Sequence, residues 1–149
     1  MVAGSSPAGG TVTRENVPDE VPFAFGKSAK PKGSKLEYRR IDRNDQWCSK
    51  SSSKHYNTWM GSPNKSCPAK GSEVLPDYPT QYAHAAVIDY NKARKKSRGS
   101  AIFLHVNGKG STAGCVSVTR SQMVTTTKWL DPKKNPRIVI APRSELKNQ

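Results

Sequence analysis

Apolar residues are concentrated in a few short runs, and most of these runs lie in the second half of the chain. They occupy residues 82–90, 101–106, 114–118 and 137–141, and glycine, proline, polar or basic residues separate them. Runs of this length between turn-forming residues are typical of β-strands, because a core helix usually needs a longer segment of apolar residues. The sequence therefore predicts four strands in this region.

One segment between these runs has the spacing of a helix. The stretch Thr119-Arg120-Ser121-Gln122 fits a capping box, in which the threonine and glutamine side chains bind each other's backbone N–H groups. Apolar side chains follow at helical spacing from Met123 to Leu130, and Asp131-Pro132 ends the pattern. We therefore expect a mainly β fold with one helix, at about residues 120–130, after the third of these strands.

The first half of the chain is poorer in apolar runs. Hydrophobic residue types make up 34% of the 149 residues, which is low for a globular chain and predicts a small core. Residues 1–21 are rich in Gly, Ser, Pro and acidic residues, and we expect them to be a disordered or extended tail. Residues 44–81 contain aromatic residues without sustained periodicity, which predicts a long surface loop. The folded domain is expected at residues 22–142, with a second tail at 143–149.

The chain carries no apolar run that approaches the roughly 18 residues of a membrane-spanning helix. Its first ten residues have neither the basic nor the apolar region of a signal peptide. We therefore expect no transmembrane segment and no export signal in this sequence.

The net charge is strongly positive. Lys and Arg number 25 against 11 Asp and Glu, a formal net charge of +14, and basic residues cluster at 27–43 and 94–98. Such clusters either attract a polyanion, meaning a nucleic acid or an anionic cell-wall polymer, or form an ordinary solvated surface. Because the chain has no zinc-finger spacing and no RNP-like segment, we expect no specific nucleic-acid partner.

Three cysteines divide into a possible pair and a single residue. Cys48 and Cys67 lie in the loop-rich half and either form a disulfide or remain two unlinked thiols, whereas Cys115 lies in the apolar half. The spacings CxxC and HxxxH do not occur, so we expect no metal site. We expect no cofactor either.

His105 and Cys115 flank a connection rich in glycine between two predicted strands. Such a connection can return the chain so that the ends of two neighbouring strands meet, which would place the imidazole beside the thiol. An adjacent imidazolium can lower a thiol pKa from ~8.5 into the range of ~3.5 to 7.5. The backbone N–H groups of Ala113, Gly114 and Cys115 could then stabilise an oxyanion. His55 and His84 are the competing bases, and a pair of buried structural residues is the competing interpretation.

The segment from Leu104 to Val116 (LHVNGKGSTAGCV) resembles the active-site segment of the L,D-transpeptidase (YkuD-like) family, which has a histidine, a stretch rich in glycine and then Ser/Thr-x-Gly-Cys. Further segments resemble a shorter, actinobacterial-type branch in the same order, over about residues 22–142: PFAFG at 22–26, YRRI at 38–41, Tyr56-Asn57, AVIDYN at 86–91, WLDP at 129–132 and PRIV at 136–139. Val106 and Ser117 depart from the family pattern, which has Gly after the histidine and Asn or Arg two residues after the cysteine.

This resemblance implies a mixed β-sheet or sandwich fold and a peptidoglycan cross-linking activity. Cys115 would be the nucleophile that forms a thioester with a stem peptide, His105 the base and later the acid, and an amine of a second stem peptide the acceptor. The family's strands before the segment at 22–26 are not found, so we expect a domain truncated at its N-terminal side. The resemblance also implies a protein outside the cytoplasm, in contact with the cell wall.

We expect the substrate to contact Tyr56, Trp59, His84 and Ser111. The expectation for Tyr56 and Trp59 follows from the aromatic residues, Trp47 included, that cluster in the polar stretch 44–81. Two alternative functions remain open. Water could replace the amine, making the protein an L,D-carboxypeptidase, or the protein could be a non-catalytic binder of anionic wall polymers or nucleic acid.

Overall fold

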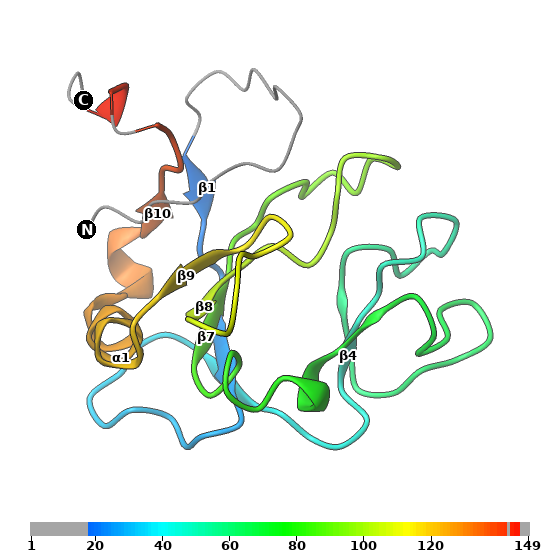
Figure 1. The fold of residues 1–149 in the computed structure, drawn as a ribbon, viewed down its shortest axis with the longest axis horizontal. Helices are drawn as coiled ribbons and strands as arrows, with labels where there is room; N and C mark the ends of the chain where they lie inside the picture. The colour runs from blue at the N-terminus through cyan, green and yellow to red at the C-terminus, as the bar shows by residue number, and fades with distance from the viewer. Residues whose placement is uncertain (1–17, 143, 147–149) are drawn as a thin grey trace.

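The computed structural model describes residues 18–142 and 144–146, and a five-stranded sheet lies at its centre (Figure 1). The strand order is β3-β2-β7-β8-β9. The inner pairs β2–β7 and β7–β8 are antiparallel, whereas the outer pairs β2–β3 and β8–β9 are parallel. The strands have the bounds β2 Ala24–Gly26, β3 Tyr38–Arg40, β7 Ala85–Val87, β8 Phe103–Val106 and β9 Val116–Val118.

The helix α1 (Arg120–Trp129) covers one face of this sheet and packs on β7 and β8. Its N-terminus has the predicted capping box, since the Thr119 side chain accepts a bond from the Gln122 N–H and the Gln122 side chain accepts one from the Thr119 N–H. Met123 is completely buried between helix and sheet. This layer confirms the predicted helix.

A three-stranded antiparallel sheet, of order β5-β4-β6, lies against the other face. Its strands are β4 (Gln46–Trp47), β5 (Trp59–Met60) and β6 (Glu73–Val74), followed by the short 3₁₀ helix η1 (Leu75–Asp77). We call residues 44–77 the aromatic lobe. Phe103 of β8 meets Trp47 of this lobe with ring centroids 5.2 Å apart, and Phe25 of β2 at 5.0 Å. The strands β2, β7 and β8 of the central sheet are therefore buried on both faces.

The stretch 44–81, expected to be a long surface loop, consists mostly of turns and bends, but the expectation missed its short strands. The stretch has its own sheet, and a disulfide between Cys48 and Cys67, which are both completely buried beside Met60. Sequence patterns missed the strands because each of the three is only two residues long, too short for any periodicity.

Residues near both ends of the described chain form a separate two-stranded sheet. Strand β1 (Asp19–Glu20) pairs with β10 (Arg137–Ile138), beyond the 3₁₀ helix η2 (Pro132–Lys134), and Val21 is buried against the helix-side core. The expected tail therefore does not extend to residue 21. The expectation for residues 1–17, and for 143 and 147–149 of the second tail, lies outside the described residues.

The predicted strands exist, but they are shorter than the apolar runs. Residues 79–84 are turns and bends rather than strand, so β7 begins only at Ala85. Within β7, successive side chains point to opposite faces of the sheet, so Ala85 and Val87 face the aromatic lobe and Ala86 faces α1. The fold is mainly β with one α-helix among the described residues, as expected from the sequence.

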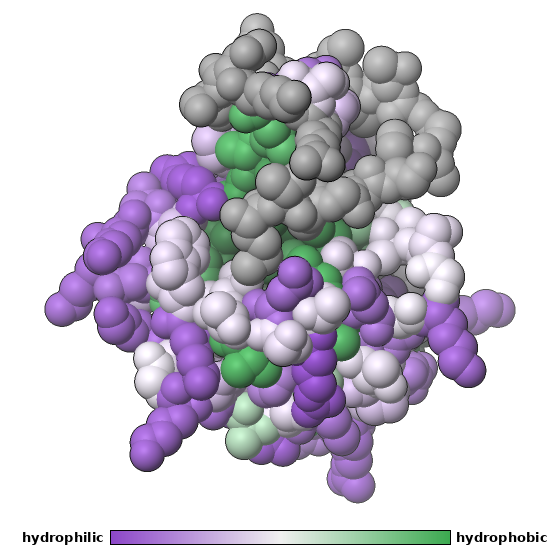
Figure 2. Space-filling view, turned by 60° about the vertical axis from the view of Figure 1, so that its left-hand side comes forward, coloured by the Kyte–Doolittle hydropathy of each residue, from purple (hydrophilic) through white to green (hydrophobic). Residues whose placement is uncertain are grey.

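Hydrophilic side chains project from much of the face that Figure 2 shows, which fits the excess of Lys and Arg. None of the helices in the described part of the chain has the length and apolar character needed to cross a membrane.

Candidate functional site

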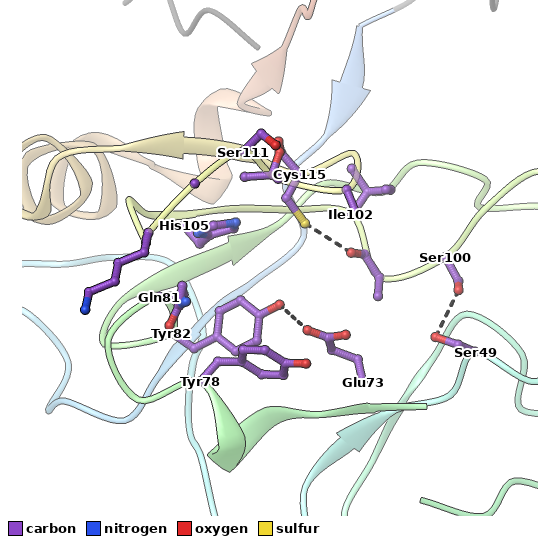
Figure 3. A pocket seen from close by; sticks show the side chains of 16 residues that line it. Ser49, Glu73, Tyr78, Gln81, Tyr82, Ser100, Ile102, His105, Ser111 and Cys115 are labelled. Atoms are coloured by element: carbon purple, nitrogen blue, oxygen red, sulfur yellow. Dashed lines mark hydrogen bonds between the residues drawn. The ribbon is translucent and has the colours of Figure 1, made fainter. Parts of the chain in front are cut away.

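A cavity of about 330 Å³ lies between the aromatic lobe and the connection from β8 to β9 (Figure 3). Cys115 and His105 both line it. Residues from three separate parts of the chain complete its walls, among them Glu73, Tyr78, Gln81, Tyr82, Lys109 and Ser111. The two residues singled out in the sequence therefore share one cavity.

The parallel pairing of β8 and β9 explains the position of Cys115. Because the two strands run in the same direction, residues 107–115 must lead the chain back from the end of β8 to the start of β9. Cys115 consequently lies beside the beginning of β8. Its Sγ accepts the Phe103 N–H at 3.4 Å and donates to the Ala101 carbonyl at 3.3 Å.

The thiol of Cys115 is held in its protonated form. Its pKa is raised to about 11, mainly by burial; the Phe103 N–H lowers it, and the Glu73 carboxylate contributes a smaller increase. The Ala101 carbonyl also favours the thiol, because a carbonyl can accept a hydrogen bond but cannot donate one. The side chain at rest is therefore a neutral thiol.

His105 lies on β8 with its side chain on the same face as Phe103. Its Nδ1 lies 2.7 Å from the Val106 carbonyl, so Nδ1 carries the hydrogen and Nε2 keeps a free lone pair. Burial lowers the pKa of His105, although the Val106 carbonyl and Glu73 act in the opposite direction. The geometry gives a neutral imidazole whose Nε2 can accept a proton. Val106 thus supplies an orienting carbonyl although it is not the glycine of the family pattern.

The expected lowering of the thiol pKa by an imidazolium is not found. No hydrogen bond joins His105 and Cys115 in the part of the chain that the structure describes. Burial raises the pKa of Cys115 and lowers the pKa of His105, because it disfavours the charged thiolate and the charged imidazolium. The pair is therefore a neutral base and a neutral thiol.

The turn before Cys115 presents several backbone N–H groups. The amides of Ala113, Gly114 and Cys115 make no backbone hydrogen bond with any residue that the structure describes. Gly114 has φ +132°, a backbone conformation that L side chains rarely adopt, and the Thr112 hydroxyl closes the turn on the Cys115 carbonyl. These three N–H groups therefore have no backbone acceptor among the described residues.

Only one of the four residues expected to contact substrate lines this cavity. Ser111 does, whereas Tyr56 is buried in the aromatic lobe and Trp59 packs edge-on against Phe25 at 5.4 Å. Buried His84 binds the Tyr38 hydroxyl through Nδ1 at 3.0 Å. None of these three residues lines the cavity, and the Trp59 ring packs on the core between the aromatic lobe and the central sheet instead. Trp47 is buried in the same way.

Two residues that sequence patterns did not single out form a polar pair in the cavity. The Tyr82 hydroxyl donates to Glu73 Oε1 at 2.6 Å, and the Tyr82 ring meets the His105 ring edge-on with centroids 5.7 Å apart. Tyr82 stands at the start of an apolar run and could have been noticed there. Glu73 lies in a polar stretch without a motif, so only its pairing through β6 reveals it.

The described residues include no group of three or more His, Cys, Asp or Glu side chains placed to hold a metal ion. In comparisons with known proteins, no family model, no curated protein and no solved structure matches the chain. Its described geometry is that of a mainly β domain with a cysteine and a histidine in one cavity.

Proposed function

We propose that this protein is a cysteine acyltransferase of the L,D-transpeptidase type, acting on the stem peptides of peptidoglycan. The observation that carries the proposal is that Cys115 and His105 line one cavity, with Ala113 beside them. The resemblance of residues 104–116 to the active-site segment of that family supports the same chemistry.

In the first half of the proposed reaction, the Cys115 thiol attacks the carbonyl that precedes a terminal D-alanine. Its proton passes to Nε2 of His105, and the amides at 113–115 hold the tetrahedral oxyanion. The C–N bond then breaks, His105 returns the proton to the departing D-alanine amine, and a thioester remains on Cys115.

In the second half, an amine of another stem peptide attacks the thioester. His105 takes a proton from this amine and gives it to the departing sulfur, so the thiol and the neutral imidazole are restored. Water in place of the amine would give hydrolysis through the same intermediate, and this carboxypeptidase alternative uses the same residues.

The resting geometry requires one movement before this reaction. The Cys115 Sγ is bound to the Ala101 carbonyl and the Phe103 N–H, not to His105. The 107–115 connection contains Gly108, Gly110 and Gly114 and is largely exposed, so it can shift with little loss of packing. We propose that substrate binding turns the thiol toward Nε2.

Two features support action outside the cytoplasm. The disulfide Cys48–Cys67 is a bond that persists in oxidising compartments. The net charge of +14 favours contact with anionic wall polymers. The same charge would favour a non-catalytic binder of such polymers, and that alternative predicts an inert Cys115.

Covalent labelling tests the proposal directly, with a carbapenem, a class of covalent ligand that the family accepts. We expect wild-type protein to gain the mass of one carbapenem and Cys115→Ala to gain none, in intact-protein mass spectrometry. His105→Gln should slow acylation by about 10²-fold or more, as expected for loss of a positioned base. His55→Ala is the matched control and should react like wild type. A folded wild-type protein that stays unmodified would exclude the proposed activity.

A further inference from the structure

Glu73 is the one carboxylate that lines the cavity among the residues that the structure describes. The chain as a whole has an excess of cations, with 25 Lys and Arg against 11 Asp and Glu. Even so, none of the ion pairs in the described part of the chain involves Glu73. Among the described residues, Glu73 is therefore the single acidic group in the wall of the cavity that holds Cys115, and it makes no ion pair with Lys109, the cation that lines the same cavity.

Tyr82 holds this carboxylate in place. Its hydroxyl donates to Glu73 Oε1 at 2.6 Å, the residue is 4% exposed, and its ring packs edge-on against Phe25 at 5.5 Å and Phe103 at 5.6 Å. Glu73 Oε2 has no hydrogen-bond partner among the described residues. Figure 3 shows the carboxylate pointing toward the side of the cavity that carries Cys115.

We propose that Glu73 is a substrate-anchoring residue that binds a primary ammonium group next to the acyl group attacked by Cys115. The inference rests on the proposed function, because it takes the acyl substrate or its amine acceptor as the owner of the ammonium. A primary ammonium fits better than a guanidinium. A guanidinium binds carboxylates best through both oxygens, whereas here Tyr82 already occupies one of them.

The Tyr78 hydroxyl provides a second group for this ammonium. Tyr78 lines the same cavity, and its ring lies 5.4 Å from that of Tyr82. The Glu73 carboxylate raises the pKa of Tyr78, so the hydroxyl stays neutral and can accept a hydrogen bond. An ammonium with three N–H donors can thus bind Glu73 and Tyr78 together.

Occupation of this site would also prepare the nucleophile. The charge of Glu73 is one of the causes that raise the pKa of Cys115. A bound ammonium compensates that charge, which makes loss of the thiol proton easier when substrate is present. Recognition and activation would then be coupled through one carboxylate.

The test measures the charge preference of Cys115 with two probes of matched shape. They are 2-aminoethyl methanethiosulfonate, which carries a primary ammonium, and 2-hydroxyethyl methanethiosulfonate, which is neutral. In each reaction the thiol loses its proton to the buffer, its sulfur displaces methanesulfinate, and a mixed disulfide forms. Because Cys48 and Cys67 are already paired, intact mass reports Cys115 alone. The measured quantity is the ratio of the cationic to the neutral rate.

We expect Glu73→Gln to lower this ratio by about tenfold or more, since one charge in a cleft raises the local concentration of a counterion by such a factor. Tyr82→Phe, which keeps the ring and removes the hydroxyl, should lower it less. Glu37→Gln is the control, because it removes an exposed carboxylate outside the cavity and should leave the ratio unchanged.

The result separates this inference from the proposed function. An unchanged ratio in Glu73→Gln, or an equal fall in Glu37→Gln, overturns the ammonium site whether or not the carbapenem reacts. A ratio that falls only in the cavity variants supports the site even if wild-type protein is not acylated, in which case the acyl transfer is excluded and the ammonium belongs to another ligand.

Discussion

At the scale of single residues, burial decides the protonation states in the cavity. His105 is buried and Cys115 is partly buried, so both favour the neutral form. Backbone carbonyls then orient the two side chains: the Val106 carbonyl binds the imidazole, and the Ala101 carbonyl accepts the thiol hydrogen. The proposed chemistry accordingly begins from a neutral pair, as in serine enzymes, rather than from a thiolate–imidazolium pair.

This protonation state predicts an unusual dependence of cysteine reactivity on pH. Because the pKa of Cys115 is raised to about 11, only its small thiolate fraction reacts at neutral pH. Alkylation of native protein by iodoacetamide should therefore accelerate about tenfold per pH unit from pH 7 to pH 10, without a plateau. Reduced and denatured protein should instead level off above pH ~8.5. A plateau of the native rate below pH 8 would indicate a thiolate at rest and contradict this prediction.

At the scale of elements, the very short strands of the aromatic lobe depend on a disulfide and buried hydrogen bonds for their stability. The aromatic lobe has three strands of two residues each, and the Cys48–Cys67 disulfide spans most of it. Gln46 adds a buried bond from its side-chain amide to the Cys67 carbonyl at 2.9 Å. Strands this short contribute little alone, so the disulfide is expected to contribute much of the lobe's stability.

Removal of the disulfide should therefore destabilise the fold. We expect Cys48→Ala with Cys67→Ala to lower the free energy of unfolding by about 3 kcal/mol, because the unfolded chain regains the entropy of an open loop. Urea unfolding followed by circular dichroism measures the change. Wild-type protein with a reductant is the control and should lose a similar amount of stability. A midpoint that responds to neither treatment would show that the lobe is held by packing alone.

At the scale of the whole molecule, the central sheet joins two separate cores. One lies between the sheet and α1, and the other between the sheet and the aromatic lobe. Phe103 of β8 is completely buried in the second core and meets rings from three parts of the chain, those of Phe25, Trp47 and Tyr82. Its backbone N–H also contacts Cys115. Phe103 thus contributes both to the packing of the lobe on the sheet and to the position of Cys115.

Phe103→Ala should therefore affect the entire fold. We expect it to lower the free energy of unfolding by about 3–5 kcal/mol, because it removes buried apolar surface and leaves a cavity among the rings. Thermal and urea denaturation both report this loss. Trp129→Ala removes a ring that is 71% exposed and should change stability by less than about 0.5 kcal/mol. Equal effects of the two substitutions would contradict the packing described above.

Local features of the chain were predictable from the sequence because they depend on neighbouring residues. The capping box of Thr119 and Gln122 and the helix that follows it involve bonds within one or two turns. The positions of β7 to β10 followed from apolar runs, although their ends did not, since turns at 79–84 shorten the first run. The assignment of Cys48 and Cys67 remained open, because two cysteines in sequence do not reveal whether their side chains meet.

The tertiary structure alone decided which distant groups share the cavity. Sequence spacing could suggest His105 and Cys115, because one connection joins them, and both do line the cavity. Glu73 lines the same cavity only because β6 pairs with β4 and the lobe packs on the central sheet. The raised pKa of Cys115 likewise depends on burial, a property of the assembled chain. Sequence determined the local conformations, whereas long-range packing determined the site's charge and solvation, because both depend on residues far apart along the chain.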